Sequence, residues 1–541
     1  MAARNPDPTP AAIDPRSGFC SETRTYHSLR PQVSLPPETT PLSVTDYVFS
    51  HLHASPPPPS APALVDASTR RSIPYPEFTR RVRALAASLQ GRLGITAAGG
   101  SAFVLSPNSL HIPILYYSLL SLGVAVSPSN PASTAAEISR QIQLCKPIVA
   151  FATAETAAKI PSLRYGTVLL DSAEFESMMT TSREIGESRR VEVGQSDTAT
   201  ILYSSGTTGR VKGVELTHRN WISVVAGVNA VRQAGSPPAV ALCAVPYFHV
   251  YGFGYCVRAL GQGDTLVTMG EGRFDLSRML RTIEELRVSH VALAPPAAVA
   301  IVKNGTATDG YDLSSLQVVG CGGAPLPRTA YGLTESTGRV FGTVGLKESR
   351  VEGAVGKLMP NFKAKIVDPE TGTGIGLPPL MPGELWLKGP FVMKGYVGDN
   401  EATAAVMDSE GWLKTGDLCY IDSEGYLFIV DRLKELIKYK GYQVAPAELE
   451  HLLQSLPDIL DAAVAPYPDE EAGQLPMAFV VKRPGSVVYE SQIKDFIAEK
   501  VAPYKRIRKL KFIDAIPRNA QGKVLRRELI KLALSPSSSK L

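Results

Sequence analysis

Hydrophobic positions along the chain change between two spacings, which predicts helices and strands in turn. Apolar residues recur at helical spacing from Phe78 to Leu93, and a short continuous apolar run follows at residues 102–105. Further apolar runs predict buried strands at residues 124–126, 148–151, 167–170, 240–243, 265–267 and 290–293. Such alternation is typical of helices layered on largely parallel sheets. We therefore expect most of the chain to have an α/β fold.

The residues after 432 show a different pattern. Pro446 stands in the first turn of an expected helix, where its missing N–H costs nothing. Strands at residues 462–465, 478–482 and 510–513 and a helix at 491–501 are expected to follow. This order indicates a small α+β domain of its own. We predict a large amino-terminal domain at residues 1–431 and a small carboxy-terminal domain at 432–541.

Composition narrows the classes of protein to consider. A chain of 541 residues is longer than one hydrophobic core supports, which agrees with two domains. The net charge of +5 is small for this length and argues against a nucleic-acid binder. The six cysteines form no CxxC pair, so neither a disulfide framework nor a zinc ribbon is expected. No apolar run reaches the roughly 20 residues that span a bilayer.

The two ends of the chain differ in what they indicate. The amino terminus has no apolar core segment, so we do not expect a secretory signal. The chain stops at Ser539-Lys540-Leu541, after a serine-rich stretch. A terminal Ser-Lys-Leu is a peroxisomal address that an import receptor reads on an exposed tail. We therefore predict a peroxisomal protein that binds this receptor.

One motif points directly to a polyanion. Residues 204–212 combine four hydroxyl side chains, two glycines and Lys212, immediately after an apolar strand at 200–203. Glycines let backbone N–H groups approach an anion, hydroxyls donate hydrogen bonds, and a lysine offsets negative charge. The spacing differs from GxxxxGK[ST], so this is a phosphate loop of another design.

The same stretch, YSSGTTGRVKGV, resembles the phosphate-loop signature of the adenylate-forming superfamily. That superfamily includes acyl-CoA synthetases, luciferases and peptide-synthetase adenylation domains. Other motifs follow in the expected order: PYFHVYG at 246–252, YGLTES at 331–336, GWLKTGD at 411–417, DRLKELIKYKGY at 431–442 and NAQGK at 519–523. The stretch VDRLKELIKYKGYQVAPAELE most resembles 4-coumarate–CoA ligases, in particular their peroxisomal plant relatives.

The resemblance implies an ATP-dependent carboxylic acid–CoA ligase. Its implied fold is a large multi-sheet domain, with two α/β sheets and a distorted β-barrel region, and a small hinged α+β cap. The implied substrates are ATP, coenzyme A and a hydroxycinnamate or a fatty or oxylipin-type acid, with Mg²⁺ as cofactor. Implied catalytic residues are Lys523, His249, Thr334 and Glu335, and Glu335 is the implied metal ligand.

Binding residues are implied in the same way. Those for ATP and AMP are Ser204, Ser205, Gly206, Thr207, Thr208, Lys212, Thr334, Asp417, Arg432, Lys434, Lys438 and Lys523. Those for coenzyme A are Arg273, Lys440 and Gly441, and those for the acid are Tyr251, Gly323, Tyr331 and Gly332. Plain structural interpretations stay open beside several roles. Asp417 could be a turn cap, while Lys434 and Arg273 could be solvated surface charges.

The sequence departs from the family pattern in one place. After Arg328, residues 329–330 lead straight to Tyr331, so a helix and a strand of the pattern are missing. Losing an interior strand should expose apolar surface and a strand edge. Two alternatives therefore stay beside the ligase: a shortened form without activity, and a luciferase-like oxygenase, which shares these motifs. The orientation of Arg339 is left open.

Overall fold

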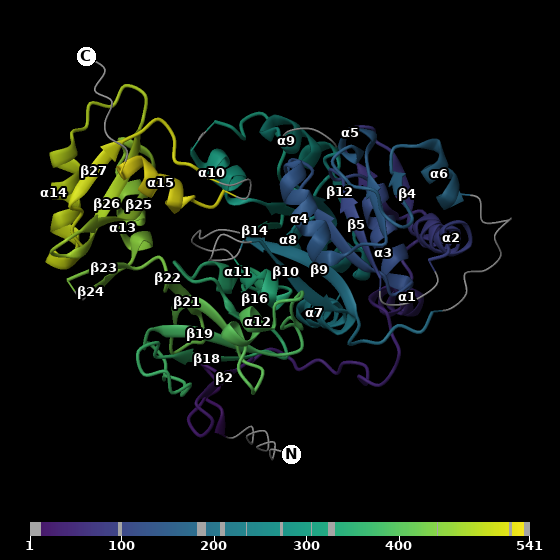
Figure 1. The fold of residues 1–541 in the computed structure, drawn as a ribbon, viewed down its shortest axis with the longest axis horizontal. Helices are drawn as coiled ribbons and strands as arrows, with labels where there is room; N and C mark the ends of the chain where they lie inside the picture. The colour runs from purple at the N-terminus through teal and green to yellow at the C-terminus, as the bar shows by residue number, and fades with distance from the viewer. Residues whose placement is uncertain are drawn as a thin grey trace. The chain divides into compact units, whose positions relative to one another are not determined.

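The computed structural model describes residues 12–95, 100–180, 191–205, 211–233, 235–270, 274–303, 306–322, 330–440, 442–518 and 522–534 (Figure 1). The chain divides into two compact units. Unit one comprises Met1–Tyr26, Ala364–Trp386 and Lys414–Leu541, and unit two comprises His27–Lys363 and Leu387–Leu413. Unit one thus contains more than the expected small domain, and a hinge at 431–432 stays a prediction.

One sheet of unit two confirms the predicted alternation. Its seven strands lie in the order β20-β10-β9-β6-β5-β7-β8, and the pairs from β9 to β8 are parallel. They are β5 (Ser101–Leu105), β6 (Ala125–Ser129), β7 (Val149–Ala152), β8 (Thr167–Leu169), β9 (Thr198–Ser205), β10 (Val211–Thr217) and β20 (Gly395–Tyr396). The helices of this stretch are α2 (Tyr75–Leu93), α3 (His111–Ser121), α4 (Ala135–Cys145), α5 (Ala154–Ala157), α6 (Ala173–Thr180) and α7 (His218–Val231). Ile138 and Ile142 of α4 share a buried core with Phe103 of β5.

A second sheet of unit two has the order β14-β13-β11-β12-β3-β4. Its strands are β3 (Pro62–Asp66), β4 (Ser72–Pro74), β11 (Val240–Cys243), β12 (Thr265–Thr268), β13 (His290–Leu293) and β14 (Val318–Cys321). The accompanying helices are α1 (Val44–Ala54), α8 (Val250–Gly261), α9 (Leu276–Glu285) and α10 (Pro295–Lys303). Met279 and Ile283 of α9 pack against Val291 and Leu293 of β13, which form one face of the sheet.

Strand β14 is the edge of this second sheet, next to the shortened segment. Its Val318 and Val319 side chains are 45% and 56% exposed. Interior strands of parallel sheets normally bury such residues on both faces. The expected exposed apolar edge is therefore present among the described residues.

Short elements connect the second sheet to the rest of unit two. The strands β15 (Tyr331–Leu333), β16 (Gly338–Gly342) and β17 (Lys357–Leu358) form a small antiparallel sheet. The 3₁₀ helix η2 (Thr334–Ser336) joins β15 to β16, and α11 (Gly345–Ser349) and α12 (Asn400–Val406) follow. Helix α8 packs against β16, which brings two predicted site segments together.

Unit one contains two further sheets. The first has the order β1-β2-β18-β19-β21-β22, with β1 (Phe19–Cys20), β2 (Thr25–His27), β18 (Lys363–Val367), β19 (Gly383–Lys388), β21 (Leu413–Ile421) and β22 (Leu427–Arg432). The second joins β24-β23-β26-β25, with β27 on β26: β23 (Ile437–Tyr439), β24 (Tyr442–Val444), β25 (Ile459–Asp469), β26 (Gly473–Lys482) and β27 (Lys509–Phe512). Its helices are α13 (Pro446–Gln454), α14 (Glu490–Lys500), η3 (Pro503–Lys505) and α15 (Arg526–Leu534).

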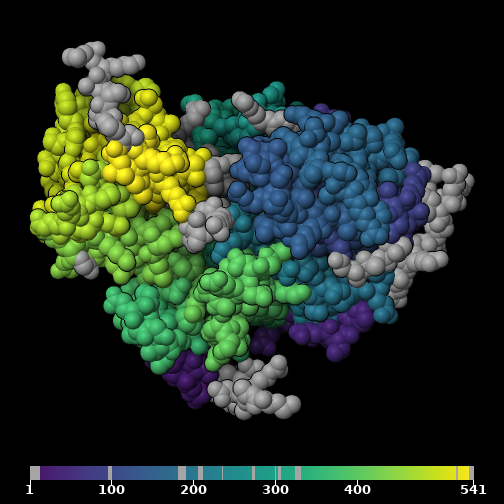
Figure 2. All heavy atoms as spheres, viewed as in Figure 1, coloured from purple at the N-terminus to yellow at the C-terminus, as the bar shows by residue number. Residues whose placement is uncertain are grey.

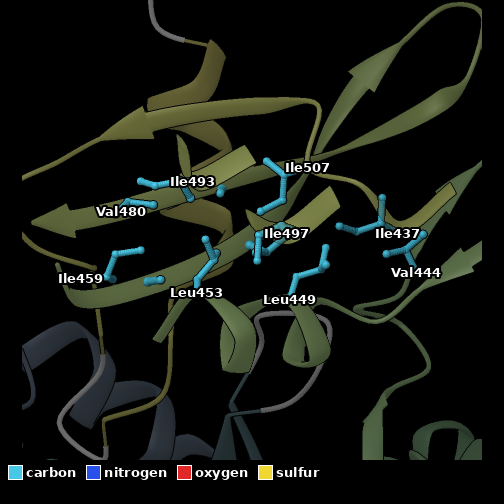
Figure 3. Close-up of a cluster of buried hydrophobic side chains, with 12 residues drawn as sticks. Ile437, Val444, Leu449, Leu453, Ile459, Val480, Ile493, Ile497 and Ile507 are labelled. Atoms are coloured by element: carbon cyan, nitrogen blue, oxygen red, sulfur yellow. The ribbon is translucent and has the colours of Figure 1, made fainter. Parts of the chain in front are cut away.

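The carboxy-terminal sheet is held by a dense apolar cluster. Leu449 and Leu453 of α13 and Ile493 and Ile497 of α14 lie against the sheet and have no exposed surface (Figure 3). Figure 2 shows one face of this region in yellow-green and yellow. The mixed α/β fold with several sheets and a carboxy-terminal α+β region is confirmed. The distorted β-barrel stays a prediction.

All six cysteines are free thiols in the structure. Within the described ranges, no helix combines the length and the hydropathy that crossing a bilayer requires.

Candidate active site

The strands β9 and β10 form the base of the predicted phosphate loop. They are antiparallel, and Lys212 pairs directly with Ser204. The Ser204 hydroxyl is buried and has no hydrogen-bond partner among the described residues. A buried hydroxyl without a partner is unfavourable, so this group fits a site that a ligand completes. Three other predicted loop residues, Gly206, Thr207 and Thr208, and the side chain of Ser205 lie outside the described residues.

Tyr396 connects Lys212 to the predicted metal ligand. The Lys212 ammonium lies 4.4 Å from the centroid of the Tyr396 ring, which is a cation–π contact. The Tyr396 hydroxyl donates a 3.0 Å hydrogen bond to Oε1 of Glu335. Burial and the neighbouring Glu335 carboxylate raise the pKa of Tyr396, so its hydroxyl stays protonated and keeps donating. Our sequence reasoning missed Tyr396, because it belongs to none of the motifs used.

The backbone around Glu335 is held on both sides. The Met393 N–H donates to the Glu335 carbonyl at 2.9 Å, and the Ser336 hydroxyl accepts from the Leu333 N–H at 3.0 Å. Thr334 opens the 3₁₀ helix η2 directly beside Glu335. The predicted catalytic pair is therefore carried on a short, hydrogen-bonded turn.

The carboxylate of Glu335 has the chemistry that a magnesium ion requires. Its Oε2 accepts no hydrogen bond from any residue that the structure describes. Mg²⁺ binds oxygen and usually takes only one or two protein carboxylates, with water and substrate phosphates as its other ligands. In the described ranges, no group of three or more His, Cys, Asp or Glu side chains could hold a metal. Glu335 thus fits an ion that is shared with a phosphate chain.

His249 and Tyr251 lie at the start of α8. His249 is the N-cap of this helix, and its Nδ1 accepts a 3.2 Å hydrogen bond from the Tyr251 N–H. Burial lowers the pKa of His249 to about 4, so the imidazole is neutral at pH 7. A neutral ring can shield a reacting group but cannot supply positive charge.

Two glycines close to Tyr251 lie in tight approaches that leave no space for a Cβ. A Cβ on Gly320 would lie 2.9 Å from the Tyr251 hydroxyl, and a Cβ on Gly252 would lie 2.0 Å from the Pro246 carbonyl. Phe253, two residues after Tyr251, is fully buried and stacks on Tyr116 with ring centroids 4.6 Å apart. Phe253 is therefore a core residue. The predicted Gly323 lies outside the described residues.

Tyr331 and Gly332 occupy the short strand β15. The Tyr331 side chain is buried and packs edge-on against Phe341, with centroids 6.3 Å apart. A Cβ on Gly332 would lie 1.8 Å from the Gly338 carbonyl, so only glycine fits this close approach of β15 and β16. Their predicted contacts with the acid stay predictions.

Unit one brings four predicted residues into one electrostatic environment. Arg432 Nε lies 3.2 Å from Oδ1 of the buried Asp417, and the two residues pair across β21 and β22. Desolvation, Arg432 and Lys523 lower the pKa of Lys434 to about 8. Burial and Arg432 likewise lower the pKa of Lys523. Asp417 is thus the ion-pair partner of Arg432. Hydrogen bonds from a ribose would be additional contacts of the same carboxylate.

The predicted coenzyme A residues are only partly described. Lys440 adopts a left-handed conformation (φ +46°) after β23, and its ammonium pairs with Glu471 at 2.7 Å. Lys438 has an exposed side chain, and its backbone N–H donates to Gln474 at 2.8 Å. Arg273 and Gly441 lie outside the described residues. Nothing in the described contacts of Lys438 or Lys440 points to one particular ligand.

Comparison with protein families and curated proteins gives consistent results. The model of the "AMP-binding enzyme" family matches residues 53–397, and that of the "AMP-binding enzyme C-terminal domain" matches 448–523. The chain is 50% identical to 4-coumarate--CoA ligase-like 9 of Arabidopsis thaliana, and 98% of each chain is covered. It is 43% identical to Peroxisomal OPC-8:0-CoA ligase 1 of the same organism, with 97% and 100% covered.

Solved structures agree with the sequence relatives. ATP-bound MatB from Rhodopseudomonas palustris has a TM-score of 0.80 at 25% identity, covering 91% of this chain and 99% of that one. The o-succinylbenzoate CoA synthetase MenE from Bacillus subtilis, in complex with its acyl-adenylate, has a TM-score of 0.74 at 25% identity, covering 89% and 97%.

Identity to the first relative is counted over 558 aligned positions, which exceeds the 541 residues of this chain. Some aligned positions therefore have no residue here. The shortening between Arg328 and Tyr331 stays a prediction.

Proposed function

The chain belongs to the AMP-binding enzyme family, and from this premise we propose that it adenylates a fatty or oxylipin-type acid and transfers the acyl group to coenzyme A. It is an ATP-dependent acid–CoA ligase of the 4-coumarate–CoA ligase-like group. The observation that carries the proposal is the contact series from Lys212 through Tyr396 to Glu335, beside the unpartnered Ser204 hydroxyl.

The chemistry explains why these residue types are needed. A carboxylate is a poor electrophile because its leaving group would be oxide. Attack of its oxygen on the α-phosphorus of ATP expels pyrophosphate and forms a mixed anhydride, from which AMP leaves readily. The two reactants are both anions, so positive charge and hydrogen-bond donors must offset their repulsion.

In this scheme each described residue has one task. Lys212 and the Ser204 hydroxyl bind the β- and γ-phosphates, Thr334 donates to the α-phosphate, and Glu335 holds Mg²⁺. The ion would supply Lewis-acid stabilisation of the phosphate charge. Neutral His249 shields the anhydride from water, and Tyr251 contacts the acyl chain. Lys523 places a positive charge between the carboxylate and the α-phosphate.

The thiol step uses other residues of the carboxy-terminal region. We assign Asp417 and Arg432 to the ribose, and Lys434 and Lys438 to the acyl-adenylate. Lys440 and Gly441, with Arg273, are assigned to coenzyme A. Because one region supplies Lys523 for the first step and Lys440 for the second, rotation about residues 431–432 between the steps is part of the proposal.

The acid and the compartment are argued from the chain end and from one relative. Residues 539–541, Ser-Lys-Leu, form a peroxisomal address, although they lie outside the described residues. Peroxisomal OPC-8:0-CoA ligase 1 is 43% identical over nearly its whole length. Both favour a peroxisomal ligase of fatty or oxylipin-type acids, bound by the import receptor, over a ligase of hydroxycinnamates.

ATP–pyrophosphate exchange with a panel of acids tests the first half-reaction, and CoA-ester formation tests the second. The proposal expects exchange with medium-chain and oxygenated fatty acids, little with coumarate, and ester formation without oxygen. Exchange with coumarate alone would overturn the acid assignment. Oxygen-dependent light or CO₂ release from a luciferin would instead identify a luciferase-like oxygenase.

A second candidate is a shortened form that binds nucleotide without turning over. The exposed edge strand β14 and the alignment positions that lack a residue favour it. Folded protein that binds ATP–Mg²⁺ but exchanges pyrophosphate with no acid would establish this alternative.

A further inference from the structure

Helix α8 is buried along its length except at two positions. Tyr251 and Arg258 are its only residues that keep substantial solvent access. They are seven residues apart, almost two full turns, so they lie on the same face of the helix. Tyr255 lies between them, four residues after Tyr251, with its ring edge-on to the Tyr251 ring. We call these three residues the α8 stripe.

The α8 stripe faces a sheet surface of small residues. Tyr251 reaches Gly320 of β14, which pairs with Ala292 of β13. His290 lies two residues earlier on β13 and therefore on the same face as Ala292. Burial lowers the pKa of His290, and the charge of Arg258 adds to this shift. The stripe thus runs from Tyr251, near Gly320, to Arg258, almost two turns further along α8.

Among the described residues, Arg258 has no acidic partner. Its guanidinium lies 4.0 Å from the centroid of the Tyr255 ring, and no carboxylate of the described residues lies within ion-pair distance. Asp264, on whose pKa the charge of Arg258 acts, is already paired with Arg232 at 3.1 Å and accepts from the Ala239 N–H at 2.7 Å. A charged group in this position fits an acceptor that the chain itself does not supply.

Strand β16, which contacts α8, carries a second arginine. Arg339 of β16 lies over Gly342, where a Cβ would be 1.9 Å from its Nε, and donates to the Thr343 carbonyl at 2.8 Å. Its side chain keeps solvent access, while desolvation, with a smaller contribution from Arg258, lowers its pKa. The nearby Glu348 is paired with Arg30 at 2.7 Å. Both Arg258 and Arg339 therefore carry positive charge without a described acidic partner.

We infer that Arg258 determines specificity by binding an oxygen acceptor, a keto or carboxylate oxygen, at the far end of the acid's hydrocarbon chain. This rests on the proposed function, which puts the reacting carboxylate beside His249 and Tyr251. Seven helical residues span about 10 Å. With bonds of about 1.5 Å, that corresponds to roughly eight carbons of extended chain. The acid is thus a medium-chain acid that carries oxygen at its distal end.

The test compares three acids of equal length: nonanoic acid, 8-oxononanoic acid and nonanedioic acid. We measure kcat/KM for acyl-AMP formation by pyrophosphate release, with wild-type protein, Arg258→Met and Arg258→Lys. Arg281→Met, which removes an exposed arginine of α9, is the matched control. Preference for the keto acid or for the diacid identifies which oxygen is bound.

Wild type should prefer one oxygenated acid over nonanoic acid by about 10-fold or more, as expected for a hydrogen bond to a charged group. Arg258→Met should lose that preference and keep its activity on nonanoic acid. Arg258→Lys should restore part of it, and Arg281→Met should behave as wild type. Equal use of all three acids by wild type, or an equal loss on all three in Arg258→Met, overturns the inference alone. No activation of any acid overturns the proposed function and the inference with it.

Discussion

The hydroxyl of Tyr396 offers the most direct test of how Glu335 is positioned. Tyr396→Phe removes one oxygen, which donates at 3.0 Å to Glu335 Oε1. It leaves the ring that lies 4.4 Å from the Lys212 ammonium. The substitution therefore separates the metal-binding side of the contact series from its phosphate-binding side.

The expected size of the effect follows from the hydrogen bond that is lost. Tyr396 is buried, with 8% of its surface exposed, so water does not readily replace the hydroxyl. A hydrogen bond to a charged group contributes about 1.5–3 kcal/mol, and every 1.4 kcal/mol is tenfold, so a roughly 10- to 100-fold loss is expected. The loss should appear as a higher Mg²⁺ requirement, because an unanchored carboxylate holds the ion less well.

The assay is ATP–pyrophosphate exchange titrated with free Mg²⁺. Tyr396→Phe should need more Mg²⁺ for half-maximal exchange. Tyr396→Leu should also weaken ATP binding, because leucine has no aromatic ring to face Lys212. Tyr420→Phe removes a hydroxyl that bonds no described residue and serves as the control. If Tyr396→Phe keeps the wild-type Mg²⁺ dependence while Glu335→Gln is inactive, the positioning role is wrong.

Three further predictions concern other parts of the chain. Lys523→Ala should abolish acyl-AMP formation but spare thioester formation from pre-made acyl-AMP; an equal fall in both would contradict its assigned role. His218 is fully buried, and burial lowers its pKa to about 3. As pH falls below 6.5, His218 therefore becomes protonated in the unfolded chain but stays neutral in the folded chain. At pH 5 this should cost about 2 kcal/mol of stability, and denaturant titrations of His218→Asn should show a smaller loss between pH 7 and pH 5. Leu453→Ala should destabilise the carboxy-terminal region by about 2–5 kcal/mol in calorimetry, whereas exposed Leu534→Ala should change it little.

Local patterns in the sequence predicted much of the fold. Strands β5 to β8 and helix α13 lie where apolar runs and Pro446 indicated them, because these signals depend only on neighbouring residues. The hairpin of β25 and β26 extends beyond both predicted runs, since its ladder continues through Tyr467 and Leu475 to the turn. The length of a strand pair depends on the residues of the partner strand, and the pattern of one strand does not include them.

The site was less predictable wherever distant segments meet. Tyr396 reaches Lys212 only because β20 pairs with β10, and no spacing rule connects residues 184 positions apart. Phe253 follows Tyr251 by two residues, and the packing of Tyr116 and Trp221 from other helices encloses it in the core. Arg258 is a single charge in an apolar run and belongs to none of the motifs. Its significance depends on which face of α8 remains accessible.

The direct pairing of Lys212 with Ser204 links catalytic competence to strand alignment. A slip of one residue between β9 and β10 would turn every side chain of one strand to the opposite face. The ammonium would then leave the Tyr396 ring while the backbone ladder stayed intact. Misaligned molecules would therefore look folded by circular dichroism and yet be inert, so a preparation's active fraction is a more sensitive measure of correct folding than its secondary structure.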